Sequence, residues 1–127
     1  MGEQKKLVLV VDDEPDVVTF ISTVLEDHGY ATVTAEDGVQ ALEQVQKQRP
    51  DLISLDITMP EKSGVKFYRE MKESDEYKDI PIVIVTGLSD DFQKFISTRK
   101  QVPAPDGYLS KPIGADDVLG AVKKLIG

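Results

Sequence analysis

The 127-residue chain contains no cysteine and a single histidine, and its apolar residues never form a long run. Without cysteine it can form neither a disulfide bond nor a thiolate metal site, and this suits the reducing cytosol. The one histidine, His28, stands at the end of an expected helix, where a cation interacts well with the helix dipole. We interpret His28 as a structural or solvated side chain.

Signals for membrane attachment are missing too. The apolar run behind the charged N-terminus, Leu7 to Val11, is too short for the h-region of a signal peptide or for a membrane span. Lys6 stands where an N-myristoylation signal requires Ser or Thr. Basic residues are a minority, since 15 Lys and Arg against 23 Asp and Glu give a formal net charge of -8. We therefore expect a cytoplasmic domain that contacts neither membrane nor nucleic acid and whose acidic clusters attract divalent cations.

Strand-like and helix-like segments alternate along the chain without a break in composition. The length fits one domain, residues 1–127. The apolar patterns predict strands at 7–11, 30–35, 52–55, 80–86 and 107–110, and helices at 15–28, 38–48, 64–73, 90–101 and 114–126. Five strand–helix pairs in strict alternation predict an α/β fold: a doubly wound, five-stranded parallel sheet with helices on both faces.

Polar residues end four of the predicted strands, where an open parallel sheet binds its ligands. They are Asp12, Asp13 and Glu14 after the first strand, Asp56 after the third, Thr86 at the end of the fourth and Lys111 after the fifth. If the strand order is the flavodoxin-like 2-1-3-4-5, the first and third strands are neighbours and their acids share one crevice. Such carboxylates repel one another unless a hard cation neutralises them, and Mg²⁺ fits this oxygen-rich site best.

These residue types match the needs of phosphoryl transfer onto a carboxylate. Asp56 could attack phosphorus as a nucleophile and form an aspartyl phosphate. The charge on the phosphoryl oxygens then needs counter-charges and donors already in place, for which Mg²⁺, Lys111 and the Thr86 hydroxyl are candidates.

Ordinary turn chemistry offers an alternative for each residue alone. Asp12 or Asp13, just before Pro15, could cap a helix N-terminus. A single Asp after a strand often only marks a loop, and Thr86 could end a strand because of its β-propensity. The functional interpretation is favoured because all these residues fall on one edge of one sheet.

Four segments together resemble the receiver domain of two-component response regulators: "VLVVDDEPD", "LISLDITMPEKSG", "IVIVTG" and "GYLSKP". The resemblance extends over essentially the whole chain, in order and with similar spacing. It implies that Asp56 is the phosphoacceptor and that Mg²⁺ is the cofactor. It further implies that Asp13 binds the metal directly, that Asp12 acts largely through water, and that Asp56 and the backbone carbonyl of Thr58 complete the ligand set.

The resemblance also assigns roles around the phosphoryl group. Thr86 would be the switch hydroxyl and Lys111 the ammonium that pairs with the phosphoryl oxygens. Tyr108 would be the switch aromatic whose rotamer follows Thr86, although an aromatic on a short strand can also serve packing alone. Pro112 would follow a cis peptide bond, and Gly64 would close the loop after Asp56.

The implied function is a phosphorylation-dependent switch whose only chemistry is self-phosphorylation and slow autodephosphorylation. The implied partners are a histidine kinase or phosphotransfer protein and an unknown downstream effector; a homodimer stays open. No effector segment follows Gly127, so we expect either a free-standing regulator or part of a larger protein. A phosphorylation-independent interaction module is an alternative. A haloacid-dehalogenase-like phosphatase is a weaker one, because the adjacent Asp pair and Pro15 break its Asp-x-Asp pattern.

Overall fold

The computed structural model describes residues 5–57, 63–86 and 106–127, and for Ser63 and Thr86 it describes the backbone alone. In chain order the elements are β1 (Leu7–Val11), α1 (Pro15–Asp27), β2 (Ala31–Ala35), α2 (Gly38–Lys47), β3 (Leu52–Asp56), α3 (Ser63–Glu73), β4 (Ile82–Thr86), β5 (Gly107–Ser110) and α5 (Ala115–Ile126). The strands form one parallel sheet in the order β2-β1-β3-β4-β5, which confirms the predicted fold class. The helix predicted at 90–101 lies outside the described residues.

The predicted boundaries agree with the structure to within one residue, except at the start of β4. That strand was predicted from residue 80 but begins at Ile82. The difference has two causes: Pro81 has no N–H to donate to the sheet, and the N–H of Ile80 donates to the carbonyl of Tyr77 in the preceding turn. Helix α1 has Pro15 in its first turn and is followed by Gly29 at a φ of 92°, a conformation that favours glycine.

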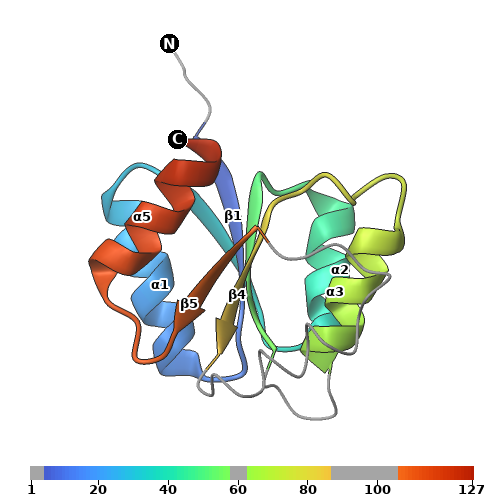
Figure 1. The fold of residues 1–127 in the computed structure, drawn as a ribbon, viewed down its shortest axis with the longest axis horizontal. Coiled ribbons are helices and arrows are strands. Elements are labelled where there is room, and N and C mark those ends of the chain that lie inside the picture. The colour runs from blue at the N-terminus through green and yellow to red at the C-terminus, as the bar shows by residue number, and fades with distance from the viewer. Residues whose placement is uncertain (1–4, 58–62, 87–105) are drawn as a thin grey trace.

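Helices cover both faces of the sheet. In Figure 1, α1 and α5 lie on one side of the strands, and α2 and α3 lie on the other. Alternate residues of the buried strands therefore enter two separate hydrophobic cores. One core joins Val8, Val10, Leu52 and Val83 to Ile21, Leu25, Val118 and Val122 of α1 and α5. The other joins Leu9, Ile53, Leu55 and Ile84 to Ala41, Val45, Phe67 and Met71 of α2 and α3.

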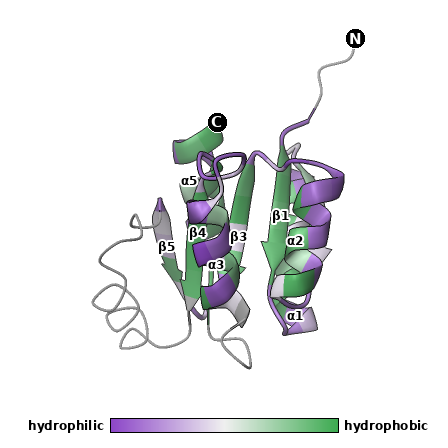
Figure 2. Ribbon diagram, turned by 90° about the vertical axis from the view of Figure 1, so that its right-hand side faces the viewer, coloured by the Kyte–Doolittle hydropathy of each residue, from purple (hydrophilic) through white to green (hydrophobic). Residues whose placement is uncertain are grey.

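The distribution of hydrophobic and hydrophilic residues agrees with this layered packing. Figure 2 shows hydrophobic central strands between helices that carry hydrophilic residues on their outer surfaces. None of the helices in the described segments is long and apolar enough to cross a membrane.

A polar contact anchors the start of β5, the strand that leads to Lys111. Asp106, just before β5, accepts a 2.9 Å hydrogen bond from the N–H of Ile82 at the start of β4. The same carboxylate oxygen lies 3.5 Å from the Nζ atom of Lys72, whose side chain is only 7% exposed on α3. Both contacts support the register in which Thr86 faces Ser110, so the residue after Ser110 emerges at the carboxyl end of the sheet.

Candidate functional site

Strand register brings the predicted acids together. Val11 pairs with Leu55 in the parallel β1–β3 ladder, so the next residues, Asp12 and Asp56, leave neighbouring strands at the same height. Both carboxylates are buried, with 2% and 1% of their residue surface exposed. Asp56 is itself the last residue of β3 and pairs with Val85.

Asp12 also shapes the turn that starts α1. Its Oδ1 atom accepts a 2.9 Å hydrogen bond from the N–H of Glu14. The N-cap position belongs to Glu14, and no side chain caps this helix end. The capping alternative for Asp12 or Asp13 is therefore wrong: Asp12 holds the residue before the helix and leaves its second oxygen facing the site.

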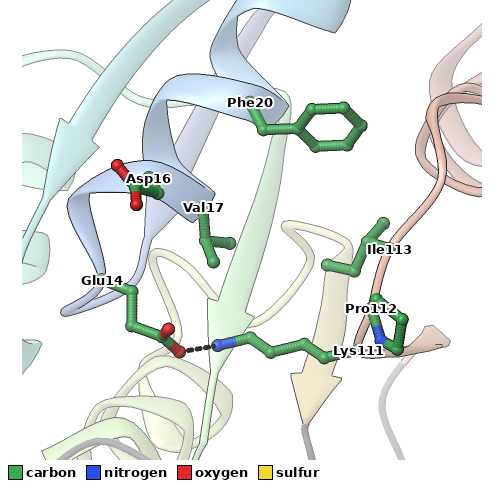
Figure 3. A pocket seen from close by; sticks show the side chains of 7 residues that line it. All are labelled: Glu14, Asp16, Val17, Phe20, Lys111, Pro112 and Ile113. Carbon is green, nitrogen blue, oxygen red and sulfur yellow. Dashed lines mark hydrogen bonds and ion pairs between the residues drawn. The ribbon is translucent and has the colours of Figure 1, made fainter.

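Lys111 connects the acids. Its Nζ atom lies 2.7 Å from Oε1 of Glu14, 3.1 Å from Oδ2 of Asp12 and 3.3 Å from Oδ2 of Asp56. The lysine side chain is only 16% exposed, so these ion pairs are partly shielded from water. Figure 3 shows the side chain reaching from the segment after β5 to Glu14 at the start of α1. The ammonium of Lys111 thus forms ion pairs with three carboxylates of the described residues.

Burial and charge shift two pKa values in this site. Burial raises the pKa of Asp12 to about 6, and the nearby charge of Asp56 adds to the rise, while the Glu14 N–H and Lys111 oppose it. Burial alone would lower the pKa of Lys111, but its hydrogen bond to Glu14 and the carboxylates of Asp12 and Asp56 raise it above its usual value. The lysine is therefore a permanent cation at neutral pH, whereas Asp12 is held close to its titration range.

The acidic residues fit a hard divalent cation. Asp12, Asp13, Glu14 and Asp56 each offer a carboxylate oxygen, and these oxygens lie within 4.8 Å of one another. Oδ2 of Asp12 is buried, and in the described residues it makes an ion pair with Lys111 at 3.1 Å but no well-aligned hydrogen bond. Carboxylate oxygens are the ligands that Mg²⁺ prefers, so the donor set matches the predicted metal.

Close backbone packing places the start of α3 against the end of β3. A Cβ atom added to Gly64 would lie 2.4 Å from the carbonyl oxygen of Asp56 and 2.9 Å from Cα of Ile57. Only glycine therefore lets α3 begin against the end of β3. The peptide bond between Lys111 and Pro112 is cis, as the resemblance implies.

Three further residues were predicted to belong to the site: Tyr108, Thr86 and Thr58. Tyr108 lies on β5 beside Ile84, with 47% of its surface exposed. Thr86 ends β4, next to the segment that carries Lys111, but its side chain is outside the description. Thr58, whose backbone carbonyl is the remaining predicted metal ligand, lies outside the described residues. The switch roles of Thr86 and Tyr108 stay predictions.

The sequence analysis placed Glu14 at this edge of the sheet but assigned it no role. Within the described residues its carboxylate makes the shortest ion pair with Lys111, although only Asp12 and Asp13 of the "DDE" run were assigned roles. Glu14 and Lys111 also border a groove of about 470 Å³ between α1 and the segment after β5. Figure 3 shows that its walls include the apolar side chains of Val17, Phe20 and Ile113.

The fold and this site define a class of signalling protein. The chain belongs to the response regulator receiver domain family, because the family model with that description matches residues 8–123. Such domains are signalling modules of two-component systems, and they generally bind Mg²⁺ in an acidic pocket.

Individual relatives agree with this assignment. The chain is 32% identical over 121 residues to the alkaline phosphatase synthesis transcriptional regulatory protein PhoP of Bacillus subtilis, covering 95% of this chain and 48% of that protein. It is 31% identical to the polar-differentiation response regulator DivK of Brucella anthropi, covering 96% of this chain and 97% of that protein. The chain thus spans about half of the former relative and nearly all of the latter. The structure of chemotaxis response regulator CheY4 of Vibrio cholerae superposes with a TM-score of 0.84 at 32% identity, covering 97% of this chain and 100% of that one.

Proposed function

We propose that residues 1–127 act as a single receiver domain in which Asp56 accepts a phosphoryl group from a phosphohistidine. The donor is a histidine kinase or a phosphotransfer protein. One observation carries this proposal: the buried carboxylate of Asp56 at the end of β3 lies 3.3 Å from the ammonium of Lys111, within a cluster of acids. A nucleophile, a fixed cation and a set of oxygen ligands are what phosphoryl transfer to a carboxylate requires.

The reaction exchanges one bond to phosphorus for another. A carboxylate oxygen of Asp56 attacks phosphorus, the bond from phosphorus to the donor's imidazole nitrogen breaks, and the imidazole takes up a proton as it leaves. The product is an aspartyl phosphate whose oxygens pair with Lys111. Asp12, Asp13, Asp56 and the carbonyl of Thr58 would hold Mg²⁺, which supplies positive charge against the phosphoryl oxygens.

The groove beside Lys111 supports a protein as the physiological donor. A phosphohistidine must come within bonding distance of Asp56, so its carrier has to dock next to the site. The groove begins at Lys111, and Val17, Phe20 and Ile113 give it apolar walls on which a partner could bury side chains.

Phosphorylation would then change the surface near Thr86 and Tyr108, and a downstream effector would recognise the changed surface.

The test is transfer of one phosphate that requires Asp56. Wild-type protein is incubated with acetyl phosphate and Mg²⁺, and the number of phosphates is counted by intact mass. Wild type and Asp16→Asn, which removes an exposed acid of α1, should each gain one phosphate, and Asp56→Asn should gain none. Phosphate on Asp56→Asn at the wild-type level would show that another residue is the phosphoacceptor. A wild type that takes none would favour the phosphorylation-independent interaction module.

A further inference from the structure

We propose that Glu14 is a positioning residue that holds Lys111 before phosphorylation and thereby slows the arrival of the phosphoryl group, an inference that rests on the proposed phosphoacceptor role of Asp56. Of the three ion pairs that Lys111 makes within the described residues, the one with Glu14 is the shortest, at 2.7 Å against 3.1 Å for Asp12 and 3.3 Å for Asp56. Glu14 is also the only one of the three acids that faces solvent, because its side chain is 60% exposed and the aspartates are buried. Lys111 is thus held between two buried carboxylates and one at the surface.

The local backbone makes Glu14 available for this contact. The residue occupies the N-cap position of α1, where a side chain commonly bonds to the helix, but its carboxylate makes no capping hydrogen bond. Its N–H donates to Asp12, which fixes the position of its backbone beside the site. Figure 3 shows the Glu14 side chain pointing toward the Lys111 ammonium, beside the apolar residues of the groove.

The number of donors on Lys111 makes the contact consequential. An ammonium has three N–H donors, and three carboxylates already surround this one. A phosphoryl group on Asp56 brings further oxygens, so Lys111 can bind one of them only by giving up a carboxylate. Glu14 is the carboxylate that leaves most easily, because water can solvate it where it stands. Until it leaves, its charge also repels an anionic phosphodonor. Both effects slow phosphorylation.

The test compares two variants that remove one negative charge from the same groove. Glu14→Gln removes the charge paired with Lys111, whereas Asp16→Asn removes a groove carboxylate that has no ion pair with Lys111 in the described residues. With acetyl phosphate and Mg²⁺, followed by intact mass, Glu14→Gln should gain phosphate about two- to fivefold faster than wild type, the scale of one exposed ion pair. Asp16→Asn should show less than half of that acceleration.

A second measurement separates this role from metal binding. Calorimetric titration of Mg²⁺ into the unphosphorylated proteins should give Glu14→Gln and Asp16→Asn dissociation constants that agree within about twofold, because both lose one nearby charge. A tenfold weaker affinity in Glu14→Gln alone would make Glu14 a metal ligand and overturn the inference.

The rate measurement has three further outcomes that overturn the inference. An unchanged or slower rate in Glu14→Gln does so while leaving the phosphoacceptor role of Asp56 intact. Equal acceleration in Asp16→Asn does so as well, because the effect is then one of general charge. If the wild type gains no phosphate, both the proposed function and this inference are contradicted.

Discussion

The ammonium nitrogen of Lys111 lies 3.3 Å from Oδ2 of Asp56, although 55 positions separate the two residues in sequence. Parallel pairing produces this contact. Strand β4 lies between β3 and β5, so the segment after Ser110 emerges beside Thr86 at the same edge of the sheet as Asp56. The position of Lys111 therefore depends on strand register. The acids that it pairs with lie at the ends of two other strands, β1 and β3.

Removal of Asp13 should abolish the response of the protein to Mg²⁺. A ligand that binds only the folded state raises the free energy of unfolding, by about 1.4 kcal/mol at a tenfold excess over its Kd. Thermal unfolding of the wild type with and without Mg²⁺ should show this stabilisation, and Asp13→Ala should lack it. The same variant should be more stable than wild type in chelator, because one of the crowded charges is gone. A wild-type response to Mg²⁺ in Asp13→Ala would exclude Asp13 as a ligand.

The pKa of Asp12 predicts an unusual dependence of stability on pH. A carboxyl whose pKa rises from 3.8 to about 6 on folding binds its proton more tightly in the folded state. Its protonation stabilises the fold, so this contribution is complete below about pH 3.8 and is lost as the pH rises through about 6. For this buried group the contribution is about 2 to 3 kcal/mol.

Asp12→Asn provides the comparison, because Asn resembles the protonated carboxyl. In chelator at pH 7.5, Asp12→Asn should have a higher free energy of unfolding than wild type, and the difference should shrink as the pH falls to 5. Urea unfolding at several pH values measures it. The explanation fails if the difference is constant or grows on acidification.

Gly64→Ala should destabilise the protein through a steric clash. The added methyl group would meet backbone atoms of Asp56 and Ile57 at less than 3 Å, so the start of α3 has to move. Overpacking of this kind typically costs about 1 to 3 kcal/mol. Urea unfolding should show a loss of this size.

Gly120→Ala is the matched control for that substitution. Gly120 lies inside α5, and a Cβ there would have no atom of another segment within 4 Å. Alanine should stabilise this helix by about 0.5 to 1 kcal/mol. Equal effects of the two substitutions would show that contact with the Asp56 backbone is not what Gly64 avoids.

The sequence was sufficient to predict the sheet and the shared edge of Asp12, Asp56 and Lys111. Strict alternation of strands and helices requires parallel pairing, and strand ends locate polar residues whatever their side-chain conformations. The start of β4 was predicted wrongly because a hydrophobic pattern does not reveal the missing N–H of Pro81 or the turn before it. The contact between Glu14 and Lys111 was not predicted, because no spacing rule says which of three adjacent acids a flexible lysine will reach.

The most direct test of the central claim is to locate the residue that carries phosphate. Protein treated with acetyl phosphate and Mg²⁺ is reduced with sodium borohydride, which converts an aspartyl phosphate into homoserine, and its peptides are sequenced by mass spectrometry. We predict homoserine in place of Asp56 in the wild type and none in Asp56→Asn. Homoserine in place of Asp12 or Asp13, or formed to the wild-type extent in Asp56→Asn, would contradict the assignment of Asp56 as the phosphoacceptor.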